Sequence, residues 1–494
     1  MENNFKNKVM SSLAWKFGER ILAQLVTFIV SIALARILDP EHYGSISLIM
    51  VFITLANVFV TSGWGSALVQ KKNADDTDFS SVFYFSIGFS IVLYIVLFIA
   101  APYIANFYEM PELNWAIRVL SLRLPLAAVN TVQNAYVSKN LIFKRFFFAT
   151  LGGTLGSAVV GIGLALILPK EYGIWALVAQ YLFNSTVDTI ILWLTVKWRP
   201  KLKFSFARLK ILISYGWKLL VSSLLDNGYN ELRSLIIGKM YTESDLAFYN
   251  RGQQFPNLIS TNINASIESV IFPSIAKYQD DKATVKRLTR RAIKTSTYLM
   301  LPLMGGLAIT ARTIVLLLLG QKWLACVPYV QIFCFVYAFW PIHTANLQSI
   351  KALGRSDLFL IMEIIKKSIG ILTLILTMKF GVLAIALGMA FTTIVSAFVN
   401  AFPNKKLMDY GYFQQMADLI PSLAMTLVMM AVVFPLNYLP LHNMIILVIQ
   451  AIVGFVVYII LSKLFKIDSF YYIFDTVKTY LGKFKNRKAK SEQA

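Results

Sequence analysis

The chain has 494 residues, of which 57% are hydrophobic and 15% are charged, whereas soluble domains carry about 25% charged residues. This composition argues against a soluble enzyme. The net charge of +22 would suggest nucleic-acid binding in a soluble protein, but in a membrane protein the positive-inside rule accounts for an excess of Lys and Arg. No nucleic-acid partner is therefore expected.

Long apolar blocks predict an all-α polytopic membrane protein. Charge-free runs such as Phe79 to Tyr108 and Leu419 to Ser462 exceed the ~20 residues that cross a bilayer as a helix. In chain order, the pattern predicts about fourteen transmembrane helices, at 12–37, 43–62, 79–101, 113–137, 146–168, 174–196, 211–237, 246–275, 292–318, 327–350, 358–378, 382–403, 416–436 and 443–463.

The distribution of basic residues predicts the orientation of these helices. In the fourteen-span arrangement, 31 Lys and Arg fall on the side that holds both termini and five on the other. Because cytoplasmic loops collect basic residues, we expect both termini to be cytoplasmic.

Two halves of the chain resemble each other. Trp15-Lys16 matches Trp217-Lys218, and the turn that begins at Arg36 matches the one that begins at Lys239. Because each half has an even number of spans, this predicts two parallel six-helix repeats, typical of transporters, forming two lobes around a cationic central cavity. The expected domains are an N-terminal lobe (1–203), a C-terminal lobe (204–410), a transmembrane hairpin (411–464), and a cytoplasmic interfacial helix with a basic tail (465–494).

Polar residues form stripes at helical spacing on four of the predicted spans. Charged side chains among lipid tails are costly, so they usually face a water-filled cavity or a partner. Bases outnumber acids here, which favours an anionic substrate such as a diphosphate, because arginine donates two hydrogen bonds to one phosphate. The candidate substrate-binding cations are Lys16, Arg20, Arg118, Arg123, Lys218, Arg233 and Arg251, and the polar lining is Gln24, Asn130, Asn230 and Gln254.

Two alternatives stay open for these charged residues. Lys16, Arg20 and Lys218 lie near the predicted cytoplasmic boundary, where a basic side chain can extend to the interface without binding substrate. The acids Asp226, Glu231 and Glu268 could carry H+ or Na+, or could be salt-bridge partners of the arginines.

The sequence contains neither a phosphate-binding loop of the G-x-x-x-x-G-K-[ST] kind nor an H-E-x-x-H motif. We therefore expect no cofactor and no metal site, and a transport step driven by an ion gradient. The segment 465–484 is amphipathic and predicts an interfacial helix held by acidic membrane lipids.

The segment Ile32 to Gly44 is similar to the "ARxLxPxxYG" turn of the polysaccharide flippase branch, close to the WzxC type, of the multidrug/oligosaccharidyl-lipid/polysaccharide exporter superfamily. Asp245 to Arg251 is similar to that branch's "LGxYxRA" segment, with Ala247 and Gly252 departing from the usual Gly and Ala. Within these motifs the resemblance carries over only Arg36 and Arg251.

The resemblance implies a flippase that moves an undecaprenyl-diphosphate-linked oligosaccharide from the cytoplasmic to the outer leaflet of a bacterial inner membrane, with a glycan polymerase and export machinery as expected partners. It also implies a V-shaped pair of lobes around a cationic cavity. A multidrug antiporter would export cations and would be expected to have an acid-rich cavity. A membrane-embedded glycan polymerase or ligase would need a large outer loop with catalytic residues, and no such loop is predicted. We therefore expect no enzymatic activity.

Overall fold

The computed structural model describes the backbone of residues 2–476, 478 and 479, and the side chains from residue 18 onward within these ranges. All regular secondary structure in this part of the chain is helical, which confirms the predicted all-α class. The chain divides into two compact units, Met1–Ala247 and Phe248–Ala494.

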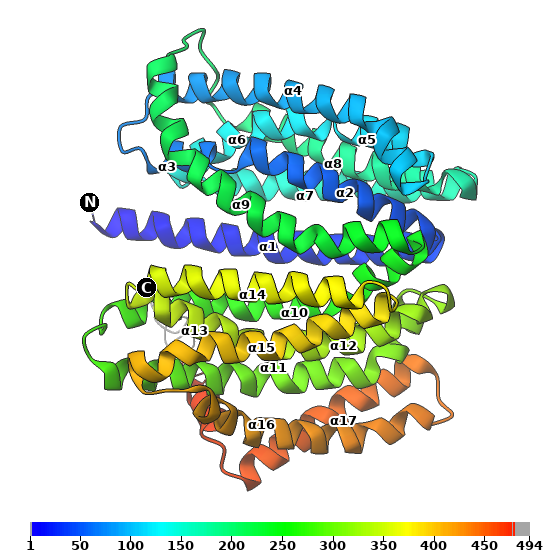
Figure 1. Cartoon of the computed structure of the whole chain (residues 1–494), viewed down its shortest axis with the longest axis vertical. Coiled ribbons are helices and arrows are strands. Elements are labelled where there is room, and N and C mark those ends of the chain that lie inside the picture. Colours follow the sequence, from blue (N-terminus) through cyan, green and yellow to red (C-terminus); the bar gives the residue numbers. More distant parts are fainter. Residues whose placement is uncertain (1, 477, 480–494) are drawn as a thin grey trace, which may run out of the picture. The chain divides into compact units, whose positions relative to one another are not determined.

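The first unit contains all the helices of the predicted N-terminal lobe, together with α9 (Figure 1). They are α1 (Glu2–Ile37), α2 (Pro40–Thr61), α3 (Trp64–Gln70), α4 (Asp76–Tyr108), α5 (Glu112–Leu120), α6 (Arg123–Asn140), α7 (Lys144–Ile167), α8 (Gly173–Thr195) and α9 (Phe206–Met240), with a 3-10 turn at Lys170–Tyr172.

The second unit begins inside α10 (Glu243–Ala276) and is built around the long helix α11. Its further helices are α11 (Lys282–Leu318), α12 (Val327–Ala338), α13 (Trp340–Ala352), α14 (Ser356–Thr377), α15 (Val382–Met408), α16 (Tyr412–Val433) and α17 (Asn443–Leu464), with 3-10 turns at Gln321–Cys326 and Phe434–Tyr438.

Within the described residues, ten helical segments are long and apolar enough to cross a membrane. The other four predicted spans are also helical, as α5 with α6, and as α9, α10 and α14. Three of them, α9, α10 and α14, each carry at least four charged residues, which is why length and apolar composition alone do not mark them. The count of fourteen spans stays a prediction.

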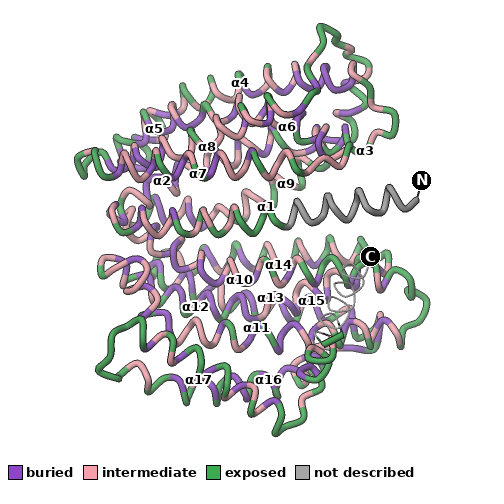
Figure 2. The backbone as a smooth tube through the Cα atoms, turned by 180° about the vertical axis from the view of Figure 1, so that it is seen from behind, coloured by how far each residue is buried: buried purple, intermediate pink, exposed green. Residues whose placement is uncertain are grey.

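Two of the charge-free spans have exposed apolar side chains at their surfaces. Figure 2 shows exposed positions at intervals along α4 and α17. On α4 these include Val92, Val96 and Ile99, and on α17 they include Val448 and Phe455. Hydrocarbon side chains at such positions are suited to contact with lipid tails.

Glycines allow two pairs of helices in the first unit to approach closely. A Cβ added at Gly152 would lie 2.5 Å from Ile191 on α8, and one at Gly156 would lie 2.8 Å from Phe183, so small residues on α7 create the space for α8. At the end of α2, Gly63 has φ 93°, and a Cβ there would lie 2.3 Å from the carbonyl oxygen of Gly216 on α9.

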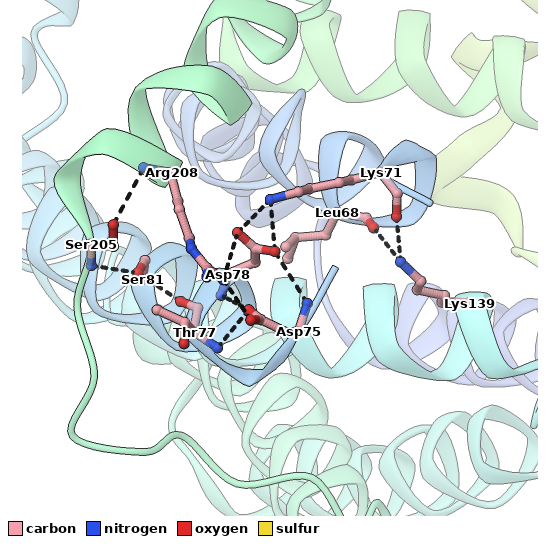
Figure 3. A network of polar contacts seen from close by, with 9 residues as sticks. All are labelled: Leu68, Lys71, Asp75, Thr77, Asp78, Ser81, Lys139, Ser205 and Arg208. Atoms are coloured by element: carbon pink, nitrogen blue, oxygen red, sulfur yellow. Dashed lines mark hydrogen bonds and ion pairs between the residues drawn. The ribbon is translucent and has the colours of Figure 1, made fainter. Parts of the chain in front are cut away.

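A polar network joins α3, α4 and the start of α9 (Figure 3). Asp75 caps α4 by accepting hydrogen bonds from the backbone N–H groups of Thr77 and Asp78. The fully buried Asp78 accepts hydrogen bonds at 2.7 and 2.8 Å from Lys71, and Arg208 of α9 pairs with Asp75 at 2.5 Å. Because α9 packs on α2, α3 and α4, it belongs to the first compact unit.

Buried amides fix α16 to the second unit. Asn346 on α13 donates to Gln415 on α16 at 2.8 Å, and Asn404 on α15 donates to Asn346 at 2.7 Å. All three side chains are fully buried. Buried amides that satisfy one another hold their helices in a single register.

The predicted domain limits fall between helices of the structure. The limit at 203/204 falls in the segment between α8 and α9, whereas the compact units divide at 247/248. The hairpin predicted at 411–464 contains α16 and α17, which pack against each other and against α11. Residues 468–476 are helical, and the rest of the predicted basic tail, from 480 on, lies outside the described residues.

Candidate functional site

The first unit contains a polar cavity of about 310 Å³ between α2, α6 and α8. Two predicted site residues, Arg123 and Asn130, line it together. The further polar residues around it are Thr54, Asn57, Thr61, Asn134, Asn184, Ser185 and Asp188. Such a lining offers both donors and acceptors, as hydroxyl-rich and charged ligands require.

Arg123 begins α6 and is held from two sides. Its Nε donates to the hydroxyl oxygen of Ser185 on α8 at 2.8 Å, and its guanidinium carbon lies 5.5 Å from the ring centroid of Tyr181. Nη1 is 3.5 Å from the sulfur of Met50 on α2. The guanidinium is therefore fixed in direction at the edge of the cavity by a hydroxyl, a sulfur and a ring, and this suits it to an anionic ligand.

Asp188 is the acid of this cavity, and sequence reasoning missed it. Its Oδ2 accepts a hydrogen bond from Nδ2 of Asn130 at 3.1 Å. The available signal was a single acid in the middle of the predicted span 174–196, with Asn184 one helical turn before it on the same face.

In the second unit, Arg251 and Gln254 are brought together on α10. Nη1 of Arg251 donates to Oε1 of Gln254 at 2.6 Å, and the guanidinium lies 5.0 Å from the ring centroid of Trp323. Arg251 is only 6% exposed. A Cβ at Gly252 would lie 2.4 Å from Cβ of Tyr329, so the departure from Ala at this motif position lets α10 approach α12.

Arg118, five residues before Arg123, lies in a different environment. Its guanidinium is 4.5 Å from the ring centroid of Phe98 and 4.9 Å from that of Trp115, and Nε donates to the carbonyl oxygen of Phe98 at 3.2 Å. It does not line the cavity of the first unit. These contacts give it a structural role in joining α5 to α4.

The candidate residues on α9 do not line this cavity either. Arg233 is buried, with its guanidinium 5.4 Å from the ring centroid of Tyr229. Glu231 is half-buried, whereas Lys218, Asp226 and Asn230 are exposed.

The remaining candidates lie on α1 and α10. Arg20 and Glu268 are exposed, and Gln24 is half-buried. Lys16 lies on α1, but its side chain is outside the described residues. The predicted cationic cavity between the lobes stays a prediction, as do the roles of these residues in it.

The described residues include no group of three or more His, Cys, Asp or Glu side chains that could hold a metal ion. The predicted absence of a cofactor stays a prediction.

The long apolar helices define a multi-pass membrane protein. Known structures support the fold. The chain is similar to the structure of the lipid II flippase MurJ in an inward closed conformation. The match covers 92% of this chain and 98% of the MurJ chain, with a TM-score of 0.76 and 16% sequence identity. An inward-facing multidrug resistance MATE family transporter of the MOP superfamily covers 80% and 95%, with a TM-score of 0.61 and 17% identity.

The sequence itself shows the family. The family described as "Polysaccharide biosynthesis protein" matches residues 33–328, and the chain belongs to it. The teichuronic acid biosynthesis protein TuaB of Bacillus subtilis (strain 168) is 23% identical over 355 residues, which is 71% of this chain and 72% of TuaB. The lipopolysaccharide biosynthesis protein WzxC of Escherichia coli (strain K12) is 23% identical over 337 residues, 67% and 68% of the two chains.

Proposed function

We propose that this protein is a flippase that moves an undecaprenyl-diphosphate-linked oligosaccharide repeat unit across the bacterial inner membrane, from the cytoplasmic to the outer leaflet. The observation that carries the proposal is the pair of positioned arginines, Arg123 and Arg251, on helices of a polysaccharide biosynthesis protein. Flipping requires a polar path for a diphosphate and sugars through the bilayer, and arginine binds phosphate bidentately.

The proposed direction of transport rests on the uneven distribution of Lys and Arg between the two sides of the membrane. With 31 Lys and Arg on the side of the termini and five on the other, both termini are cytoplasmic in this account. The substrate therefore enters from the leaflet where lipid-linked sugars are assembled. The product reaches the outer leaflet, where a glycan polymerase and export machinery are the proposed partners.

We further propose that an ion gradient drives the transport step, because the sequence has no ATP-binding loop. The candidate carriers of H+ or Na+ are the predicted acids Asp226, Glu231 and Glu268, to which the cavity of the first unit adds Asp188. Each of the four acids is replaced in turn by its amide, Asp to Asn or Glu to Gln, and transport is measured with and without an ion gradient. The variant that lacks the ion carrier should transport at a rate that no longer depends on the gradient. If transport by all four variants still depended on the gradient, this part of the proposal would be contradicted.

The test of the flippase function is the side of the membrane on which the precursor accumulates. The gene is deleted in its native host, and an impermeant glycan-modifying enzyme is applied to spheroplasts. We expect the lipid-linked precursor to be protected on the cytoplasmic side and the surface polysaccharide to be lost, with both restored by the wild-type gene. Normal sidedness and normal polysaccharide, in a host without a second flippase, would contradict the proposal and direct attention to drug efflux.

A further inference from the structure

A basic pocket of about 480 Å³ lies at the beginning of α11, beside the short helix 468–476 that follows α17. It is separate from both arginine sites described above. Five basic residues of α11 line it, within a little more than two helical turns: Lys286, Arg287, Arg290, Arg291 and Lys294.

Three of these five cations are paired with carboxylates. Lys286 is 2.7 Å from Asp409, and Lys294 is 3.4 Å from Asp468. Arg290 makes two hydrogen bonds of 2.7 Å to Asp418. These pairs neutralise one side of the cluster and connect α11 to α15, α16 and the short helix.

The other two cations, Arg287 and Arg291, contact a hydroxyl group and an aromatic ring. Across the described ranges, neither has a carboxylate within 4.0 Å. Nη2 of Arg287 is 3.4 Å from the hydroxyl oxygen of Thr284, and the guanidinium carbon of Arg291 lies 3.5 Å from the ring centroid of Tyr472. Both arginines are exposed, so the pocket keeps an excess of positive charge that is open to a ligand.

The short helix forms a fixed wall of this pocket. Phe470 is 9% exposed and packs into an apolar cluster with Tyr298 of α11 and Tyr458 of α17. Tyr472, on another face of the same helix, lines the pocket and carries the contact to Arg291. Burial of one face of the helix therefore helps to position the other face, beside the ion pair between Lys294 and Asp468.

The pocket lies at the level where the apolar membrane surface ends. An apolar groove of about 670 Å³ runs along α11, α16 and α17 and reaches Phe470 and Phe474 of the short helix. The groove is almost entirely lined by hydrocarbon side chains, as expected within the bilayer. An amphipathic helix at its end marks the zone of the lipid head groups.

We propose that Arg287 and Arg291, with Tyr472 as the wall, bind the phosphate group of an anionic phospholipid head group in the leaflet at this end of α11. Basic clusters next to a membrane-spanning helix attract anionic lipids, and two adjacent guanidinium groups match the oxygens of a phosphate. This site does not depend on the proposed transport activity, since neither arginine belongs to the candidate transport site.

The proposal is tested on the full chain in nanodiscs of phosphatidylcholine with and without phosphatidylglycerol, by native mass spectrometry of the lipids that stay bound. Wild-type protein should retain phosphatidylglycerol in preference to phosphatidylcholine. The double variant Arg287→Gln/Arg291→Gln should retain at least about tenfold less of it, as expected for the loss of two basic residues that attract anionic lipid. Tyr472→Phe should behave like wild type, because the ring is kept.

The matched control is Lys277→Gln/Lys282→Gln, which removes the same charge from exposed residues near the same end of α11 that do not line the pocket. Equal loss of phosphatidylglycerol in both double variants would show general attraction by charge and would overturn the site. A large excess of inorganic phosphate tests whether the ligand of the site is a lipid head group or free phosphate. Undiminished lipid retention supports the head-group assignment, whereas displacement of the lipid by free phosphate, together with phosphate binding in lipid-free detergent, would overturn it.

Discussion

At the scale of residues, two arginines on neighbouring helices have different surroundings and should respond differently to mutation. Arg123 lines the polar cavity, whereas Arg118 lies between two aromatic rings. We expect Arg123→Lys, which keeps the charge but loses the planar fork, to reduce export at least about tenfold, as for the loss of one charged hydrogen bond. Arg118→Lys should leave export per molecule close to wild type. Surface polysaccharide normalised to the protein in the membrane measures both, and equal effects would contradict the assignment of Arg123.

How much of this site the sequence could predict depended on the residue type. Arg123 and Asn130 could be found because charge and amide groups in an apolar span are rare. Arg118 was predicted on the same grounds, yet its cation–π partners come from α4 as well as α5, and helical spacing within one span does not reveal a neighbouring helix. Asp188 was detectable as an isolated mid-span acid, but its hydrogen bond to Asn130 joins residues 58 positions apart.

Asp75, which lies outside the membrane-spanning segments, makes the stability of the folded protein depend on pH. The hydrogen bond from Arg208, together with the backbone N–H groups of Thr77 and Asp78, lowers the pKa of the Asp75 carboxyl to about 2. Because the folded-state pKa lies below the value of about 3.9 for an unperturbed Asp, the stabilisation is present above about pH 4 and is lost as the pH falls toward 2.

Asp75→Asn should therefore lower the melting temperature of the purified protein by a constant amount between about pH 5 and 8, and the difference should shrink in more acidic buffer. The effect is small, at most about 1 kcal/mol, because the pair is half exposed. If the difference in melting temperature between the wild type and the variant grew as the pH fell, stabilisation by the ion pair of Asp75 and Arg208 would be contradicted.

At the scale of elements, glycines at the two ends of α2 allow close approach to the start of α10 and to α9. A Cβ at Gly44 would lie 1.9 Å from the carbonyl oxygen of Glu243, and one at Gly63 would meet Gly216. We expect Gly44→Ala or Gly63→Ala to cost about 2–3 kcal/mol in free energy of unfolding, the cost of overpacking a tight contact. At Gly63 the left-handed backbone conformation adds strain.

Gly88→Ala is the matched control for these variants. Gly88 lies inside α4 with no atom within 4 Å of an added Cβ, so this variant should be stabilised by up to about 1 kcal/mol, since alanine favours the helix. Thermal unfolding of the detergent-purified variants gives the comparison. A loss of stability in the Gly88 variant similar to that at Gly44 or Gly63 would contradict the assignment of tight contacts to these two glycines.

Helix positions were more predictable than helix interruptions. The predicted span 113–137 is divided into α5 and α6 around Ser121 and Leu122. The apolar spacing that predicts a span averages over about 20 residues. A local break of two residues leaves that average unchanged.

At the scale of the whole molecule, composition predicts a membrane protein, and matches between the two halves of the sequence predict internal repeats. The family match and the fold of known flippase and transporter structures agree with that class. The compact units divide at 247/248 and not at the predicted repeat boundary of 203/204, because α9 packs on α2, α3 and α4. Similarity between two halves of a sequence does not specify such packing, and the repeats stay a prediction.

The central claim is that this chain alone moves a lipid-linked oligosaccharide across a bilayer. The direct measurement is reconstitution into liposomes with a fluorescent undecaprenyl-diphosphate oligosaccharide, followed by quenching of the label in the outer leaflet. We predict exchange between leaflets that rises with the amount of protein and falls at least about tenfold in Arg251→Ala, whose buried guanidinium binds the anion in this account. Exchange no faster than in protein-free liposomes, with folded protein present under an imposed ion gradient, would contradict it.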